Sequence, residues 1–124
     1  MNKDIISLTI PNKPDYISLA RLTASGIGSS MGLNVEDIED IKVSIGEACI
    51  NSLILNERDI ISLNFEIDEE KLCIKVTDVK EYLPEVLEER KERELGLLII
   101  KSLMDEVIFN EYGIEMIKYI EDED

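Results

Sequence analysis

Residues 44–52 of the chain have the sequence SIGEACINS, within a helical pattern of apolar residues. Glu47 and Asn51 are four residues apart, which places their side chains on one face of a helix, about one turn from each other. A carboxylate can orient or deprotonate a hydroxyl group, and an amide oxygen can ligate a hard cation. This pair on a mostly apolar helix therefore has the chemistry that a Mg-nucleotide site requires.

Outward from this segment, we expect its helix to begin at Asn34, because acidic residues fill the early turns, where negative charge suits the helix dipole. A first helix is expected over residues 14–31, where apolar residues recur at helical spacing. Alternating apolar and polar residues predict a strand over residues 4–10. The N-terminal half is thus a strand followed by two helices.

The C-terminal half contains two predicted hairpins with a helix between them. The hairpins are expected over residues 60–67 with 72–76 and over 106–110 with 114–120, and the helix over 95–104, entered through Gly96. Helices are thus segregated from mainly antiparallel strands. The order predicts an α+β fold, a two-layer α/β sandwich with a mixed, mostly antiparallel sheet and helices on one face.

One segment has two possible conformations from its sequence. Residues 81–94 are highly charged and form either a short amphipathic helix or a mobile loop. Glu89 and Arg93 are at helical spacing and are expected to pair on a solvated face.

Length and composition indicate one globular domain. The chain has 124 residues, which we assign to a single domain over residues 1–120 and an acidic, disordered tail over 121–124. The first ten residues have the pattern of neither a signal peptide nor a transit segment, and no apolar run reaches the ~20 residues of a membrane span. We therefore expect a cytoplasmic protein that does not bind a membrane.

The charge balance excludes several kinds of function. The net charge is −15, so a nucleic-acid backbone is repelled and direct nucleic-acid binding is not expected. The chain has no histidine, which removes His-based acid–base chemistry, His-ligated zinc and phosphohistidine transfer. Any general base must be a carboxylate. Cys49 and Cys73 are expected to be buried free thiols.

Three segments together carry a family resemblance. They are SIGEACINS at 44–52, LCIKVTD at 72–78 and ELGLLIIKSLMDEV at 94–107. In this order and at these separations they resemble the anti-sigma factor serine kinases of Gram-positive bacteria. Those kinases belong to the wider group of gyrase, Hsp90, histidine-kinase and MutL (GHKL) ATPases. The resemblance covers nearly the whole chain and implies their Bergerat-type, histidine-kinase-like ATPase fold.

The resemblance also implies a role for each matching residue. Glu47 matches the catalytic base, and Asn51 matches the asparagine that binds Mg²⁺. Asp78 matches the aspartate that hydrogen-bonds the adenine amino group. Gly96 matches the glycine that lets backbone N–H groups approach the phosphates at a helix N-terminus. Arg21 matches an arginine on the partner-binding surface of the first helix.

Proteins of this family bind a sigma factor and keep it from RNA polymerase. They also use ATP to phosphorylate a serine of an anti-sigma factor antagonist, in stress or sporulation control. The resemblance therefore implies Mg²⁺ and ATP as cofactors, a sigma factor and an anti-sigma antagonist as partners, and a homodimer.

The chain departs from the family pattern in its glycine loops. The family has Asp-x-Gly-x-Gly where residues 78–82 have the sequence DVKEY, and before the last helix only Gly96 remains of a glycine-rich stretch. Three hypotheses stay open. The first is a regulatory kinase that also binds its sigma factor. The second is a nucleotide-independent binding module that controls its partner by competition only. The third is an ATPase-like domain that regulates a protein other than a sigma factor.

Overall fold

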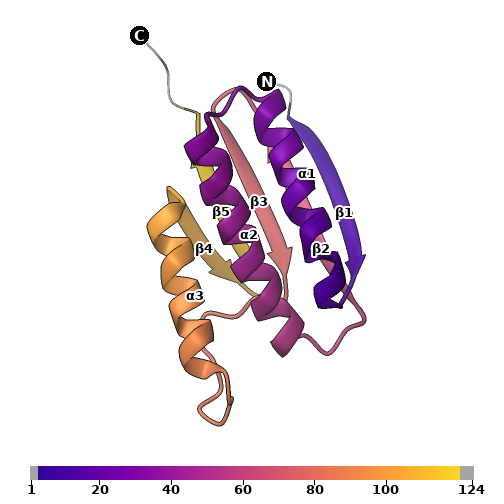
Figure 1. Ribbon diagram of the computed structural model, residues 1–124, viewed down its shortest axis with the longest axis vertical. Helices are drawn as coiled ribbons and strands as arrows, with labels where there is room; N and C mark the ends of the chain where they lie inside the picture. The colour runs from indigo at the N-terminus through magenta and orange to yellow at the C-terminus, as the bar shows by residue number, and fades with distance from the viewer. Residues whose placement is uncertain (1–2, 121–124) are drawn as a thin grey trace.

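The computed structural model describes residues 3–120 as a sheet with α-helices packed on it (Figure 1). In chain order the elements are β1 (Asp4–Pro11), a 3-10 turn (Pro14–Tyr16), α1 (Ile17–Ser30), α2 (Val35–Leu55), β2 (Ile60–Ile67), β3 (Lys71–Thr77), α3 (Arg90–Leu103), β4 (Glu106–Asn110) and β5 (Gly113–Tyr119). The predicted disordered tail at 121–124 lies outside the described residues.

The sheet has the strand order β1-β2-β3-β5-β4, and neighbouring strands pair antiparallel throughout. One row of paired residues crosses it from edge to edge: Leu8, Leu63, Val76, Ile114 and Phe109. The predicted α+β two-layer sandwich is confirmed. The expected mixed sheet is instead wholly antiparallel, because β2–β3 and β4–β5 are hairpins and the two helices after β1 return the chain beside it in the opposite direction.

All three α-helices lie on one face of the sheet, with α2 between α1 and α3 (Figure 1). The core fills the space between the layers. Ile41, Ile45 and Ala48 of α2 are completely buried, as are Phe65 and Ile74 of the sheet. α2 is therefore the central helix, and its polar residues are held in place by packing on both sides.

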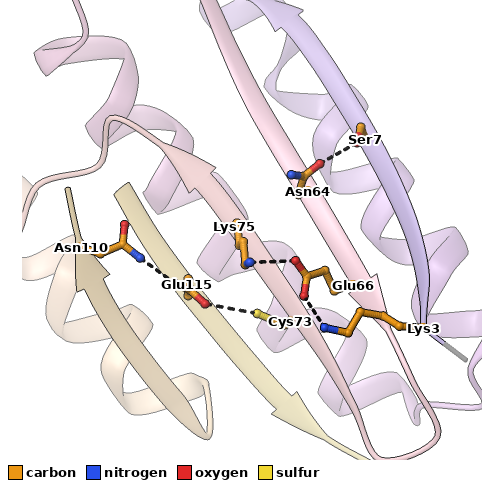
Figure 2. Close-up of polar contacts among 8 residues, drawn as sticks. All are labelled: Lys3, Ser7, Asn64, Glu66, Cys73, Lys75, Asn110 and Glu115. Carbon is orange, nitrogen blue, oxygen red and sulfur yellow. Dashed lines mark hydrogen bonds and ion pairs between the residues drawn. The ribbon is translucent and has the colours of Figure 1, made fainter. Parts of the chain in front are cut away.

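Within residues 3–120, no helix covers the opposite face of the sheet, which carries a polar network (Figure 2). The carboxylate of Glu66 accepts hydrogen bonds from Lys3 at 3.0 Å and forms an ion pair with Lys75 at 2.7 Å. Ser7 donates to Asn64 at 2.6 Å across β1 and β2. Side chains alternate between this polar face and the core, as expected for half-buried strands.

Two anchors position α2 and α3. The side chain of Asn34 caps α2 by accepting from the backbone N–H of Asp37 at 2.7 Å, which confirms the predicted start of that helix. Lys118 on β5 is buried beneath the helices, and its Nζ donates to the carbonyl of Leu103 at 2.7 Å. The same Nζ lies 3.7 Å from Asp37 and 3.5 Å from Asp40. One lysine thus joins the start of α2 to the end of α3.

Two helix boundaries differ from the prediction. Residues 14–16 form a 3-10 turn before α1, and α3 begins at Arg90 rather than at Leu95. The charged segment therefore divides, with residues 79–89 outside any regular helix or strand and residues 90–94 joined to α3. No helix among residues 3–120 is long and apolar enough to cross a membrane.

Candidate functional site

The C-terminal half of α2 lies next to α3 and next to the segment that follows β3. Glu47 projects from α2 toward α3, where its Oε1 lies 3.4 Å from Nη1 of Arg93. Both side chains are mostly shielded from solvent, with 19% of Glu47 and 11% of Arg93 exposed. The predicted catalytic carboxylate is therefore held beside a guanidinium.

One turn later on α2, the buried side chain of Asn51 contacts the chain just after β3. Its Oδ1 accepts from the backbone N–H of Lys80 at 3.2 Å, and its Nδ2 donates to the carbonyl of Lys80 at 3.4 Å. An amide oxygen has two lone pairs, so Oδ1 keeps one for a further partner. This contact brings the predicted metal ligand beside the segment that contains Asp78.

Asp78 follows the last residue of β3 in a left-handed conformation, with φ of 62°. Asp and Asn tolerate this conformation better than other residues with a side chain. Its backbone N–H donates to the carbonyl of Tyr112 at 2.8 Å. Its Oδ2 is shielded from solvent and accepts no hydrogen bond from any described residue. Nε of the exposed Arg58 lies 3.8 Å from this oxygen, which is too far for a hydrogen bond.

Gly96 lies inside α3 rather than at its N-terminus, which corrects the expected helix start. It is buried beneath the pair of charges. A Cβ at this position would lie 2.8 Å from Oε1 of Glu47 and 3.2 Å from Nη1 of Arg93. The glycine therefore leaves room for the two charged groups to meet over α3.

Arg21 projects from α1 onto α2, where its guanidinium lies against Gly46. A Cβ on that glycine would overlap the guanidinium, so Gly46 leaves the space in which the end of the Arg21 side chain lies. Burial raises the pKa of the nearby Cys49 thiol to about 12, and the positive charge of Arg21 acts in the opposite direction. Arg21 is half-buried rather than fully solvated, and Cys49 and Cys73 are buried free thiols as expected.

Two surface hollows flank the segment after β3. One, of about 420 Å³, is lined by residues 78–82 together with residues of β4 and the turn to β5. The other, of about 350 Å³, is lined by residues 55–58, Asp78 and Lys80. Asp78 thus borders both hollows, whereas Glu47 and Asn51 line neither of them.

The sequence did not reveal the partners of the predicted site residues. Arg93 was expected to pair with Glu89, but its guanidinium contacts Glu47 instead, and the ion pair at helical spacing joins Arg90 to Glu94 at 2.9 Å. One sequence signal could have indicated that Arg93 faces the site: Arg93 and Gly96 are three residues apart, so they lie on the same face of α3.

These residues fit a magnesium nucleotide. Mg²⁺ is usually bound by one or two protein oxygens together with substrate phosphates, and Asn51 has a free lone pair for such a contact. Within residues 3–120, no group of three or more Cys, Asp or Glu side chains is placed to hold a metal ion by itself. The unpaired Oδ2 of Asp78 has the capacity to accept a hydrogen bond from an N–H group of a ligand.

Comparisons with known proteins identify the family of the chain. The sequence profile of the histidine kinase-like ATPase domain matches residues 10–118. The serine-protein kinase RsbW of Oceanobacillus iheyensis is 38% identical over 144 aligned positions, which include 99% of this chain and 91% of that protein. The RsbW of Bacillus licheniformis is 36% identical, with 84% of this chain and 76% of that protein covered. The RsbW of Staphylococcus aureus is 36% identical, with 98% of this chain and 90% of that protein covered.

These alignments also show that the chain is shorter internally than its relatives. The alignment with the Oceanobacillus protein spans 144 positions and the chain has 124 residues, so at least 20 positions of that relative have no counterpart here. The profile match over residues 10–118 spans the positions of Glu47, Asp78 and Gly96. The fold, the profile match and the identity over nearly the whole chain lead to one conclusion: the chain belongs to the histidine kinase-like ATPase domain family, among the RsbW-like serine-protein kinases.

Proposed function

We propose that this protein is an anti-sigma regulatory factor that binds a sigma factor and phosphorylates a serine of an anti-sigma factor antagonist with Mg-ATP. One observation carries the proposal. Glu47 and Asn51 lie one turn apart in the C-terminal half of α2. The segment after β3, which contains Asp78, contacts Asn51, and Gly96 of α3 lies beside Glu47. These residue types supply a base, a metal ligand, an adenine acceptor and space for close approach.

In this proposal each residue has a distinct task. The carboxylate of Glu47 accepts the proton of the substrate serine hydroxyl as its oxygen bonds to phosphorus. The amide oxygen of Asn51 ligates Mg²⁺, which neutralises phosphate charge. The unpaired Oδ2 of Asp78 accepts a hydrogen bond from the adenine amino group. Gly96 leaves space above α3 beside the base.

The partner surface is proposed to be α1 around Arg21, in a cytoplasmic homodimer. The guanidinium of Arg21 is positively charged and half-buried, so it suits an acidic group of a sigma factor. The net charge of −15 opposes direct nucleic-acid contact, so the proposed control of transcription acts through protein partners alone.

Calorimetric titration with Mg-ATP tests the nucleotide part of the proposal. We expect saturable binding that is weakened by Asn51→Ala and by Asp78→Asn. The first change removes a metal ligand, and the second removes the negative charge and replaces one of the two acceptor oxygens by an NH2 donor. Glu39→Gln is the matched control, since Glu39 is an exposed residue of α2 whose ion pair with Lys42 lies outside the candidate site. If the wild type binds no nucleotide at millimolar concentration, the proposed kinase function is wrong, and competition remains as the way in which the protein controls its partner.

Phosphate transfer tests the reaction itself. Glu47→Gln is expected to retain nucleotide binding and to lose transfer to a candidate antagonist by at least ~100-fold, which is the usual contribution of a general base. A variant that transfers phosphate at the wild-type rate contradicts the role of Glu47. Capture of a sigma factor by the wild type, reduced by Arg21→Ala, tests the partner surface.

A further inference from the structure

Arg93 is the least exposed cation at the candidate site. Its side chain is 11% exposed, compared with 41% for Arg90, 46% for Lys101 and 71% for Arg58. Removing a guanidinium from water is costly unless charged partners compensate for it. A shielded guanidinium at the proposed nucleotide site is therefore expected to have a negatively charged partner.

The contact between Arg93 and Glu47 is loose. Their distance of 3.4 Å exceeds the ~2.7–2.9 Å of a strong charge-assisted hydrogen bond. The guanidinium carries five N–H donors, and within residues 3–120 its one side-chain hydrogen bond is to Glu47. Arg93 therefore has most of its donor capacity left for another anion.

The backbone of α3 offers few free amides near this position. Gly96 is the seventh residue of the helix, so its N–H lies beyond the first four, which are the only ones without helical partners. The N–H groups of Arg90 and Arg93 are also taken, by the carbonyls of Leu87 at 3.2 Å and Glu89 at 2.9 Å. A phosphate beside Glu47 must therefore be bound mainly by a side chain.

We propose that Arg93 is a phosphate-binding residue that exchanges the carboxylate of Glu47 for the terminal phosphates of the nucleotide. The inference rests on the proposed nucleotide binding. A guanidinium binds phosphate through two parallel hydrogen bonds, which suits it better than its single loose contact with Glu47. The exchange also frees the base from its counter-ion when the nucleotide is present. Gly96 permits it, because no side chain there separates the two groups.

The test compares nucleotides that differ in their phosphates. Titrations of Mg-ATP and of AMP are carried out with the wild type, Arg93→Gln and Arg93→Lys. Arg90→Gln is the matched control, because Arg90 lies in the same turn of α3 and pairs with the exposed Glu94. We expect Arg93→Gln to weaken Mg-ATP binding by roughly 10- to 100-fold, as for loss of a hydrogen bond to a charged group, and to leave AMP binding unchanged. Arg93→Lys recovers part of the affinity, and Arg90→Gln changes neither.

Three results overturn the inference. If Arg93→Gln binds Mg-ATP as well as the wild type, Arg93 does not contact phosphate. If it binds more tightly, Arg93 instead blocks the site by holding Glu47. If Mg-ATP and AMP weaken equally while the fold is intact by thermal melting, Arg93 has a structural role. Failure of the wild type to bind either nucleotide is a separate result, which overturns the proposed function together with this inference.

Discussion

Replacement of Lys118 by methionine is expected to destabilise the protein by about 2–3 kcal/mol. Methionine keeps most of the buried apolar stem but loses the ammonium group. The loss of a hydrogen bond from a charged donor to the carbonyl of Leu103 costs about 1.5–3 kcal/mol. The longer contacts with Asp37 and Asp40 add only a few tenths of a kcal/mol each, because those carboxylates are partly exposed and solvent screens them.

Urea unfolding monitored by circular dichroism measures this change. The midpoint is expected to fall while the slope with denaturant stays constant, because the surface exposed on unfolding is nearly the same. Lys42→Met is the matched control, since Lys42 forms an ion pair with the exposed Glu39 on α2 at 3.3 Å, and loss of this pair is expected to cost less than about 0.5 kcal/mol. If Lys118→Met costs no more than this control, the buried ammonium does not anchor the two helices.

Three further changes test other parts of the fold. The hydrogen bond from Lys75 is the main cause that lowers the pKa of Glu66 below its usual range, so the resulting stabilisation is present above the unfolded-state pKa of ~4.3 and is lost as pH falls through the lower folded-state pKa. Glu66→Gln should therefore cost about 0.5–1 kcal/mol at pH 7 and almost nothing at pH 2, by urea unfolding at both pH values. Gly113→Ala should cost more than about 2 kcal/mol and lower the melting temperature, because φ is +151° and the new Cβ would overlap the carbonyl oxygen of Val76; an unchanged melt contradicts this. Asn34→Ala should cost about 1 kcal/mol through loss of the α2 cap, whereas Asn34→Asp should restore it in the same assay.

Much of the fold could be predicted because local patterns and tertiary packing agree. Alternation fixed the faces of β2 and β3, and Asn34 marked the start of α2. The start of α3 was missed because residues 88–94 have no capping signal and their charges suit a solvated loop as well as a helix. Tertiary packing against α2 decides between these possibilities, and a single sequence contains no direct record of it.

The candidate site was predictable in its residues but not in their contacts. Glu47 and Asn51 follow from spacing on one helix. Their partners do not, because Arg93 is 46 residues from Glu47 in the sequence and Lys80 contributes only backbone atoms, which any residue could supply. The burial of Lys118 was also not predicted. Its place in the alternating pattern of β5 puts it on the core face of the sheet, whereas its charge suggests a surface position.

The anchor at Lys118 has a mechanical consequence for α3. The helix is held at Leu103, and Arg93 lies ten residues away, or about 15 Å along the axis. If α3 tilts about this end, its displacement grows with distance from Leu103 and is greater at Arg93. A tilt of about 5° moves Arg93 by roughly 1.3 Å while Leu103 stays in place. A displacement of this size is enough to make or break the 3.4 Å contact between Arg93 and Glu47, and it requires no unfolding of α3.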